Sequence, residues 1–330
     1  MTTMNDRTTV MDDPLTELMA GPGLRLAPTI ASARGALEAA WLDLLTVSDA
    51  VLEAPWPWRP AESRDADVRY GFYRIHERLE TAIARVAHGR MAAGEGSAVG
   101  PAVPILAAAT AARWDLRAAL AALDEEDLDR DPGGGEWSVR RTLGHVVASQ
   151  RAYGWYTAWW LDRGHAPGPV PSTAGDDRMP ELPDEEAEAI GSRAEIVARL
   201  DDLVDLAAER FGPLDARALA VPARWSGFEV DVRFRLVRLG SHLREHTIQV
   251  DKTAVMLGRP ATEVERLVRL IGGSYGRLEG LVFARSADAL AEPLADGGSA
   301  AHVVATCTAD VRELAASVAR AAAAGGPAGG

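Results

Sequence analysis

Apolar residues recur along most of the chain at intervals of three and four, which is the period of an α-helix with one buried face. In residues 31–54, for example, Leu37, Trp41, Leu44 and Leu45 fall on one such face. The alternation of period two that is typical of a half-buried strand is nearly absent. The pattern therefore predicts an all-α protein.

Segments rich in proline and glycine separate the predicted helices. We expect a flexible leader (1–24), an N-terminal helical hairpin (25–90), a four-helix core bundle (100–260), a C-terminal helical segment (261–325) and a disordered tail (326–330). The predicted helices of the bundle cover 102–129, 136–164, 184–212 and 227–258. Ser138 is expected to cap the second of these helices, because its hydroxyl precedes the first turn. Residues 67–80 and 231–244 are also alike, which suggests a partial internal duplication.

Composition narrows the classes of function. The 330 residues carry a net charge of −13, which argues against nucleic acid as a partner because phosphate binding needs a basic face. The single cysteine, Cys307, excludes an intrachain disulfide and fits a reducing compartment. The chain shows neither a signal-peptide pattern nor an apolar run long enough to span a membrane. We therefore expect a cytoplasmic protein.

The residues with the clearest candidate chemistry are three histidines. His242 and His246 stand four apart in a predicted helix, so both imidazoles project from one face. His145 lies among apolar residues of another predicted helix and is the best candidate for a third ligand. Three histidines that leave coordination positions open are typical of a catalytic metal site. Two ordinary histidines on a helix remain the simpler alternative for the pair.

The same helical stripe carries Arg235, Arg238 and Gln249, and its apolar neighbours suggest that it is partly buried. Buried polar groups need partners, and a metal ion together with a substrate anion would satisfy both the imidazoles and an arginine. A solvated polar face is the alternative interpretation of this stripe.

Two segments carry a family resemblance. "EWSVRRTLGHV", followed some ninety residues later by "HLREHTIQ", resembles the DinB-like superfamily of four-helix metalloproteins over roughly residues 100–260. The resemblance implies an up-and-down four-helix bundle in which His145, His242 and His246 bind one divalent metal ion. Zinc is favoured, with nickel, manganese or iron as alternatives. Characterised members include S-transferases and isomerases that use mycothiol or bacillithiol, in which the metal lowers the pKa of the cosubstrate thiol.

The resemblance thus implies a metal-dependent enzyme that joins a low-molecular-weight thiol, mycothiol being favoured, to an electrophilic small molecule. We assign Arg235 and Tyr156 to catalysis, and Arg238, Gln249 and Ser149 to binding of the thiol cosubstrate, whose carboxylate the arginines would hold. Further aromatic residues are candidates for the pocket wall or for ordinary core packing: Tyr153, Trp155, Trp159 and Trp160.

Other interpretations of the motif are weaker. His242 to His246 also reads H-x-x-E-H, a protease motif, but Glu245 points away from the ligand stripe and the sequence offers no α/β domain. Ile248 stands where DinB-like sulfoxide synthases carry a glutamate. A non-catalytic metal-binding or stress-response module remains the alternative function, and a homodimer stays open.

Overall fold

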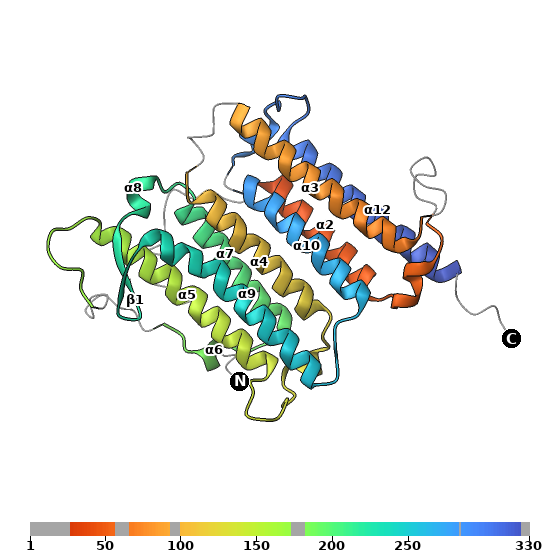
Figure 1. The fold of residues 1–330 in the computed structure, drawn as a ribbon, viewed down its shortest axis with the longest axis horizontal. Helices are drawn as coiled ribbons and strands as arrows, with labels where there is room; N and C mark the ends of the chain where they lie inside the picture. The colour runs from red at the N-terminus through yellow and green to blue at the C-terminus, as the bar shows by residue number, and fades with distance from the viewer. Residues whose placement is uncertain (1–26, 57–65, 93–99, 173–181, 284, 325–330) are drawn as a thin grey trace, which may run out of the picture.

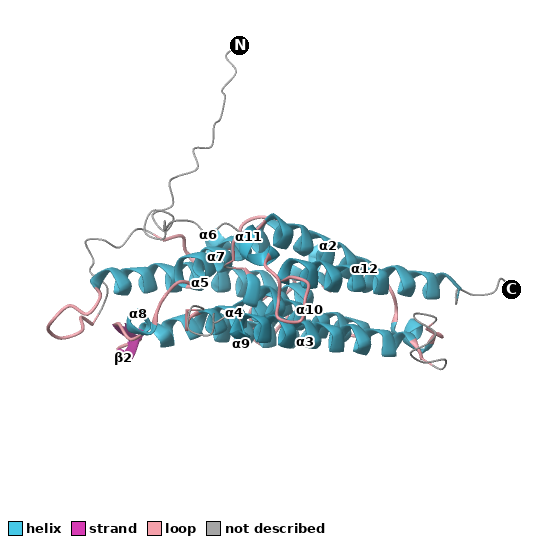
Figure 2. Ribbon diagram, turned by 90° about the horizontal axis from the view of Figure 1, so that it is seen from above, coloured by secondary structure: helices cyan, strands magenta, loops and turns pink. Residues whose placement is uncertain are grey.

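The structure is a computed structural model that describes residues 27–56, 66–92, 100–172, 182–283 and 285–324. The predicted leader (1–24) and tail (326–330) lie outside these ranges. The described chain is helical apart from one two-stranded hairpin, which confirms the all-α prediction. Its long helices form two four-helix bundles side by side (Figure 1) and are stacked in two layers (Figure 2).

The first bundle consists of α4 (Val103–Ala121), α5 (Val139–Arg163), α7 (Arg193–Phe211) and α9 (Val232–Met256), and the second of α2 (Pro28–Leu45), α3 (Val68–Ala92), α10 (Glu263–Val282) and α12 (Ala300–Ala324). Short elements lie in the connections: η1 (Asp49–Glu53), η2 (Glu125–Leu128), α6 (Glu185–Glu188), α8 (Ala216–Leu219) and α11 (Ala287–Ala291). Each bundle has its own apolar core. None of the described helices combines the length and the apolar character needed to cross a membrane.

The helices of the first bundle do not alternate strictly in direction. α4 and α9 run one way, whereas α5 and α7 both run the other way (Figure 1). A strictly up-and-down bundle would reverse direction at every connection. Here the chain crosses over between the end of α5 and the start of α7, so that α7 packs beside α5 in parallel. This crossover also places α6 against α5.

The second bundle joins segments from both ends of the chain. α2 and α3 lie diagonally across it, and each packs against both α10 and α12. The predicted N-terminal hairpin is therefore not a pair of neighbouring helices. The apolar face of a helix does not show which other helix it packs against. Here the apolar faces of α2 and α3 pack against the C-terminal helices and share one core with them.

The bundles meet where α10 crosses α4, and small residues let the two backbones approach closely. A Cβ atom on Gly280 would come within 2.4 Å of the Ala107 Cα atom, and one on Gly276 within 2.7 Å of the Ala111 Cα atom. Any side chain at these glycines would force the helices apart. Trp114 of α4 then extends into the core of the second bundle, where it packs edge-on against Tyr275.

Buried charges also connect the two bundles. The Arg113 guanidinium, which is fully buried, donates to Asp205 of α7 at 2.7 Å and to the buried Glu279 of α10 at 2.6 Å. Arg34 of α2 donates to the same two carboxylates. Because each charge has opposite charges beside it, this cluster can exist away from water.

Three of the predicted helices differ in their bounds. The helix predicted over 102–129 ends with α4 at Ala121, and η2 follows as a separate turn. The helix predicted over 227–258 begins later than expected. Residues 222–231 instead form the hairpin of β1 (Pro222–Trp225) and β2 (Phe228–Asp231). Ser226 and Gly227 turn the chain with positive φ angles of 45° and 87°, and the Asp231 side chain caps α9 by accepting from Phe234 N. The predicted helix over 184–212 is likewise divided into α6 and α7.

The two similar segments, 67–80 and 231–244, occupy matching places. They lie on α3 and α9, which run parallel to α10 and α4 respectively. When the two segments are aligned, Arg78 corresponds to His242. Arg78 donates a hydrogen bond to Asp310 at 2.8 Å. The second bundle therefore has an ion pair at this place, and the described residues hold a metal-ligand cluster in the first bundle alone.

Candidate metal centre

α5 and α9 bring the three predicted histidines together. The Ser138 hydroxyl accepts a hydrogen bond from Arg141 N, so the predicted cap starts α5 and places His145 in its second turn. α9 runs antiparallel to α5 and presents His242 and His246 toward it. The Nε2 atom of His242 lies 3.2 Å from that of His145 and 3.0 Å from that of His246.

In two of these rings the Nδ1 atom, which faces away from the cluster, takes part in a hydrogen bond. The Nδ1 atom of His145 lies 2.6 Å from a Glu185 carboxylate oxygen, and that of His246 lies 2.8 Å from the Gln249 amide oxygen. Both oxygens are acceptors, so each Nδ1 carries the proton and each Nε2 presents a lone pair to the cluster. The Nδ1 atom of His242 is buried and has no hydrogen-bond partner among the described residues.

This arrangement fits a metal ion. Without a cation, His242 alone could supply a proton to the cluster, and only one of its two neighbours could receive that proton at a time. Ligands of a tetrahedral zinc ion at ~2.0–2.1 Å would lie about 3.3 Å apart, close to the two separations observed. All three ligand atoms lie within 4.8 Å of one another, so one divalent ion could bind all three lone pairs.

The surroundings favour the neutral form of His242 and His246. Burial, together with the smaller effects of its two histidine neighbours and Arg238, lowers the pKa of His242 to about 3. Burial also lowers the pKa of His246, against the opposing effect of its bond to Gln249. Neutral imidazoles are the form that binds metal ions, so at neutral pH these two rings need not lose a proton first.

Glu185 is the site residue that the sequence analysis missed. It comes from α6, on the crossover between α5 and α7. Its approach depends on Gly144, because a Cβ atom there would lie 2.2 Å from the Glu185 carbonyl oxygen. The sequence holds a weak signal in the glycine directly before His145, but nothing in the chain order indicates that α6 lies above it.

A cavity of about 400 Å³ lies between α5 and the β1–β2 hairpin, and none of the three histidines lines it. The predicted catalytic residues Arg235 and Tyr156 both line it, and the Arg235 guanidinium carbon lies 5.6 Å from the Tyr156 ring centre. Arg235 is 4% exposed, and burial lowers its pKa to about 10, so it stays charged at neutral pH.

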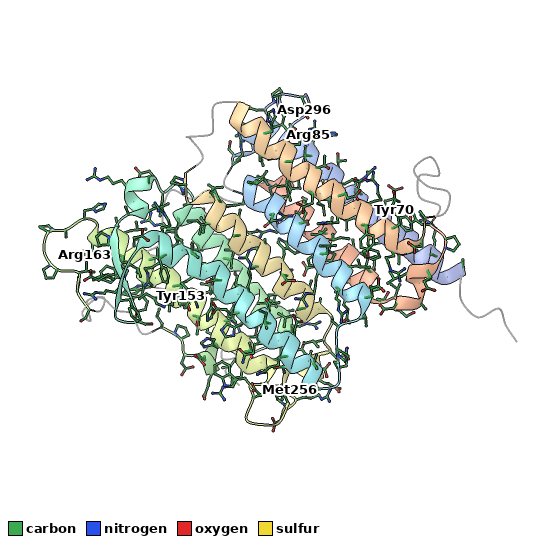
Figure 3. All side chains as sticks on the ribbon, viewed as in Figure 1. Tyr70, Arg85, Tyr153, Arg163, Met256 and Asp296 are labelled. Atoms are coloured by element: carbon green, nitrogen blue, oxygen red, sulfur yellow. The ribbon has the colours of Figure 1, made fainter. Side chains whose placement is uncertain are left out.

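Tyr153 connects the cavity with the histidines. Its ring lines the cavity and its centre lies 5.2 Å from that of His242, at the seam of α5 and α9 (Figure 3). Its hydroxyl is hydrogen-bonded to Arg238 and Ser149, and burial raises its pKa. These two residues, which we had assigned to the cosubstrate, therefore contact the tyrosine in the structure.

The remaining predicted residues are also placed. Gln249 bonds to His246, as described above. Glu245 is exposed and pairs with Arg238 at 2.7 Å, so it does not face the cluster as a protease base would. Among the candidate wall residues, Trp160 lines the cavity together with Tyr153, whereas Trp155 is buried in the bundle core and Trp159 packs against that core.

Comparison with known proteins agrees with this geometry. Residues 108–250 match the model of the DinB superfamily, a range that contains all three histidines and most of the first bundle. This part of the chain is thus similar to the DinB superfamily. No curated protein and no solved structure matches the chain.

Proposed function

We propose that the protein is a divalent-metal-dependent enzyme that activates a low-molecular-weight thiol, with mycothiol favoured, for transfer to or exchange on an electrophilic small molecule. The observation that carries the proposal is the position of three convergent histidine Nε2 atoms, which Tyr153 connects with a cavity that contains a buried, charged arginine. A merely structural metal site would have no need of this cavity.

His145, His242 and His246 would hold the ion, and zinc is the favoured metal. Three neutral ligands leave the ion its full positive charge, so that when bound it would lower the pKa of a thiol and supply a thiolate near neutral pH. Glu185 and Gln249 orient two of the imidazoles by accepting their Nδ1 protons. Cys307, the single cysteine of the chain, is buried in α12 of the second bundle, so its thiol is not placed to compete with the cosubstrate in the cavity.

The remaining side chains would position the reactants. Arg235 and Tyr156 would hold the anionic end of a reactant within the cavity. Arg238, tied to Tyr153 and Glu245, would place positive charge beside the thiolate, and Ser149 would fix the Tyr153 hydroxyl. In the transfer, the thiol proton leaves to solvent and the sulfur lone pair forms the new C–S bond. The leaving group departs with its bonding pair and takes a proton from solvent.

The test is a thiol panel of mycothiol, bacillithiol, glutathione and cysteine against a range of electrophiles, with metal-loaded protein. We expect at least one pair to react faster than with the His242→Ala variant. His165→Ala removes an exposed loop histidine and is the matched control, because it should keep full activity. Metal binding without thiol transfer on any electrophile class would instead favour a non-catalytic metal-binding module.

A further inference from the structure

Arg235 is a buried guanidinium without an acidic partner. Its Nη1 atom donates to the Arg224 carbonyl oxygen at 2.7 Å, whereas its Nε atom is buried and has no hydrogen-bond partner. No carboxylate of the described residues pairs with it. Arg113, the other arginine buried this deeply, contacts two carboxylates. An unpaired buried charge is costly, so a position of this kind is suited to an anion that arrives from outside.

The bonded Nη1 atom determines how an anion would bind. It leaves free the edge of the guanidinium that carries Nε and Nη2, and this edge matches the two oxygens of a carboxylate. The neighbouring arginines do not offer a second anion site. Arg224 pairs with Glu229 at 3.0 Å, and Arg238 pairs with Glu245. The cavity therefore selects for one anionic group.

Aromatic rings form a large part of the remaining cavity wall. Tyr153, Tyr156, Trp160 and Trp225 line it, and the centre of the Trp225 ring lies 5.4 Å from the Arg235 guanidinium carbon. Such walls favour a flat, apolar body over a hydrated sugar. Trp225 is contributed by the β1–β2 hairpin, so this hairpin determines the shape of the outer wall.

The distance to the metal centre is suitable for a reactant. Arg235 and His242 lie seven residues apart on α9, which places them on the order of 10 Å apart along the helix axis. Tyr153 lies between them, in contact with the cavity and with the His242 ring. A ligand bound to Arg235 by one end can extend past Tyr153 toward a thiol at the histidines.

We infer that this cavity binds the electrophilic substrate, and that this substrate carries one carboxylate on a flat unsaturated or aromatic body. That this ligand is the electrophile rests on the proposed function. That it carries one carboxylate on a flat body rests on the cavity alone. Mycothiol has amides and sugar hydroxyls but no carboxylate, so it cannot be the partner of Arg235. The arginine that we first assigned to the thiol is thus assigned to the other reactant.

The experiment measures binding of cinnamate and of neutral cinnamamide to the metal-loaded protein, by calorimetry and by quenching of tryptophan fluorescence. We expect cinnamate to bind at least tenfold more tightly than the amide. Arg235→Gln should abolish this difference, whereas Arg233→Gln, which removes an exposed charge from the same helix, should preserve it. Wild-type protein alone already tests the charge preference, should Arg235→Gln not fold.

Two results would overturn the inference. One is equal affinity of the wild type for cinnamate and cinnamamide. The other is displacement of cinnamate by carboxylate-bearing thiols, such as glutathione, together with no displacement by mycothiol, because the carboxylate site would then belong to the thiol. The binding assay contains no thiol reaction. Selective cinnamate binding without any thiol transfer would therefore contradict the proposed function and leave the ligand class intact.

Discussion

The His145 imidazole and the Glu185 carboxylate are joined by a hydrogen bond of 2.6 Å between Nδ1 and Oε1, across forty residues of sequence. The bond fixes the tautomer of His145 and directs its Nε2 lone pair at His242. It also connects the metal centre to the crossover between α5 and α7.

Loss of this carboxylate should weaken metal binding. We expect Glu185→Ala to lower the affinity for zinc by about 10–100-fold, because nothing would then orient His145 or raise its basicity. Competition with a chromophoric chelator measures the affinity. Glu186→Ala is the matched control on the same short helix and should bind like the wild type. Equal affinities of the two variants would show that the Glu185 bond does not support the site.

Removing a charge from the buried ion cluster between the bundles should destabilise the protein more than removing a charge from an exposed ion pair. Glu279→Ala removes one of the two carboxylates to which the fully buried Arg113 donates, so we expect a loss of about 3 kcal/mol in the free energy of unfolding. Urea denaturation measures it. Glu263→Ala, which breaks the solvent-exposed pair with Arg69, should lower the free energy of unfolding far less. A similar small loss for Glu279→Ala would contradict the role of this cluster.

Cys307 should be inert in the folded protein. Burial raises the pKa of its thiol to about 12, so almost no thiolate is present near pH 8. A chromogenic disulfide reagent should react only after the protein is denatured, and Cys307→Ala should keep full thiol-transfer activity. Rapid labelling of the native protein, or loss of activity in the variant, would point to a nucleophile that the proposed mechanism lacks.

Local sequence patterns were sufficient to predict the helices and the three histidines. The helical period placed His242 and His246 on one face, and Ser138 marked the start of the helix that carries His145. These features depend on residues close together in the chain, and the structure confirms that the three rings meet. The helical stripe likewise led to Arg235, which does line the cavity.

The features that the sequence did not predict depend on contacts between distant segments. Glu185 reaches His145 only because α6 packs against α5 and Gly144 lets the two helices come close. The hairpin that supplies Trp225 is short, and its turn at Ser226 and Gly227 lies at the edge of a segment with helical periodicity. The sequence pattern therefore predicted helix there. The pairing of α2 and α3 with the C-terminal helices likewise requires knowledge of which apolar faces meet.

The central claim is that the three histidines hold a metal ion to which a thiol can bind. The most direct measurement is the absorption spectrum of the cobalt-substituted protein, recorded before and after addition of mycothiol. We predict one cobalt ion per chain, no such ion in the His242→Ala variant, and a new sulfur-to-cobalt charge-transfer band when the thiol is added. A protein that binds cobalt through these histidines, yet shows no charge-transfer band with any thiol of the panel, would contradict the account.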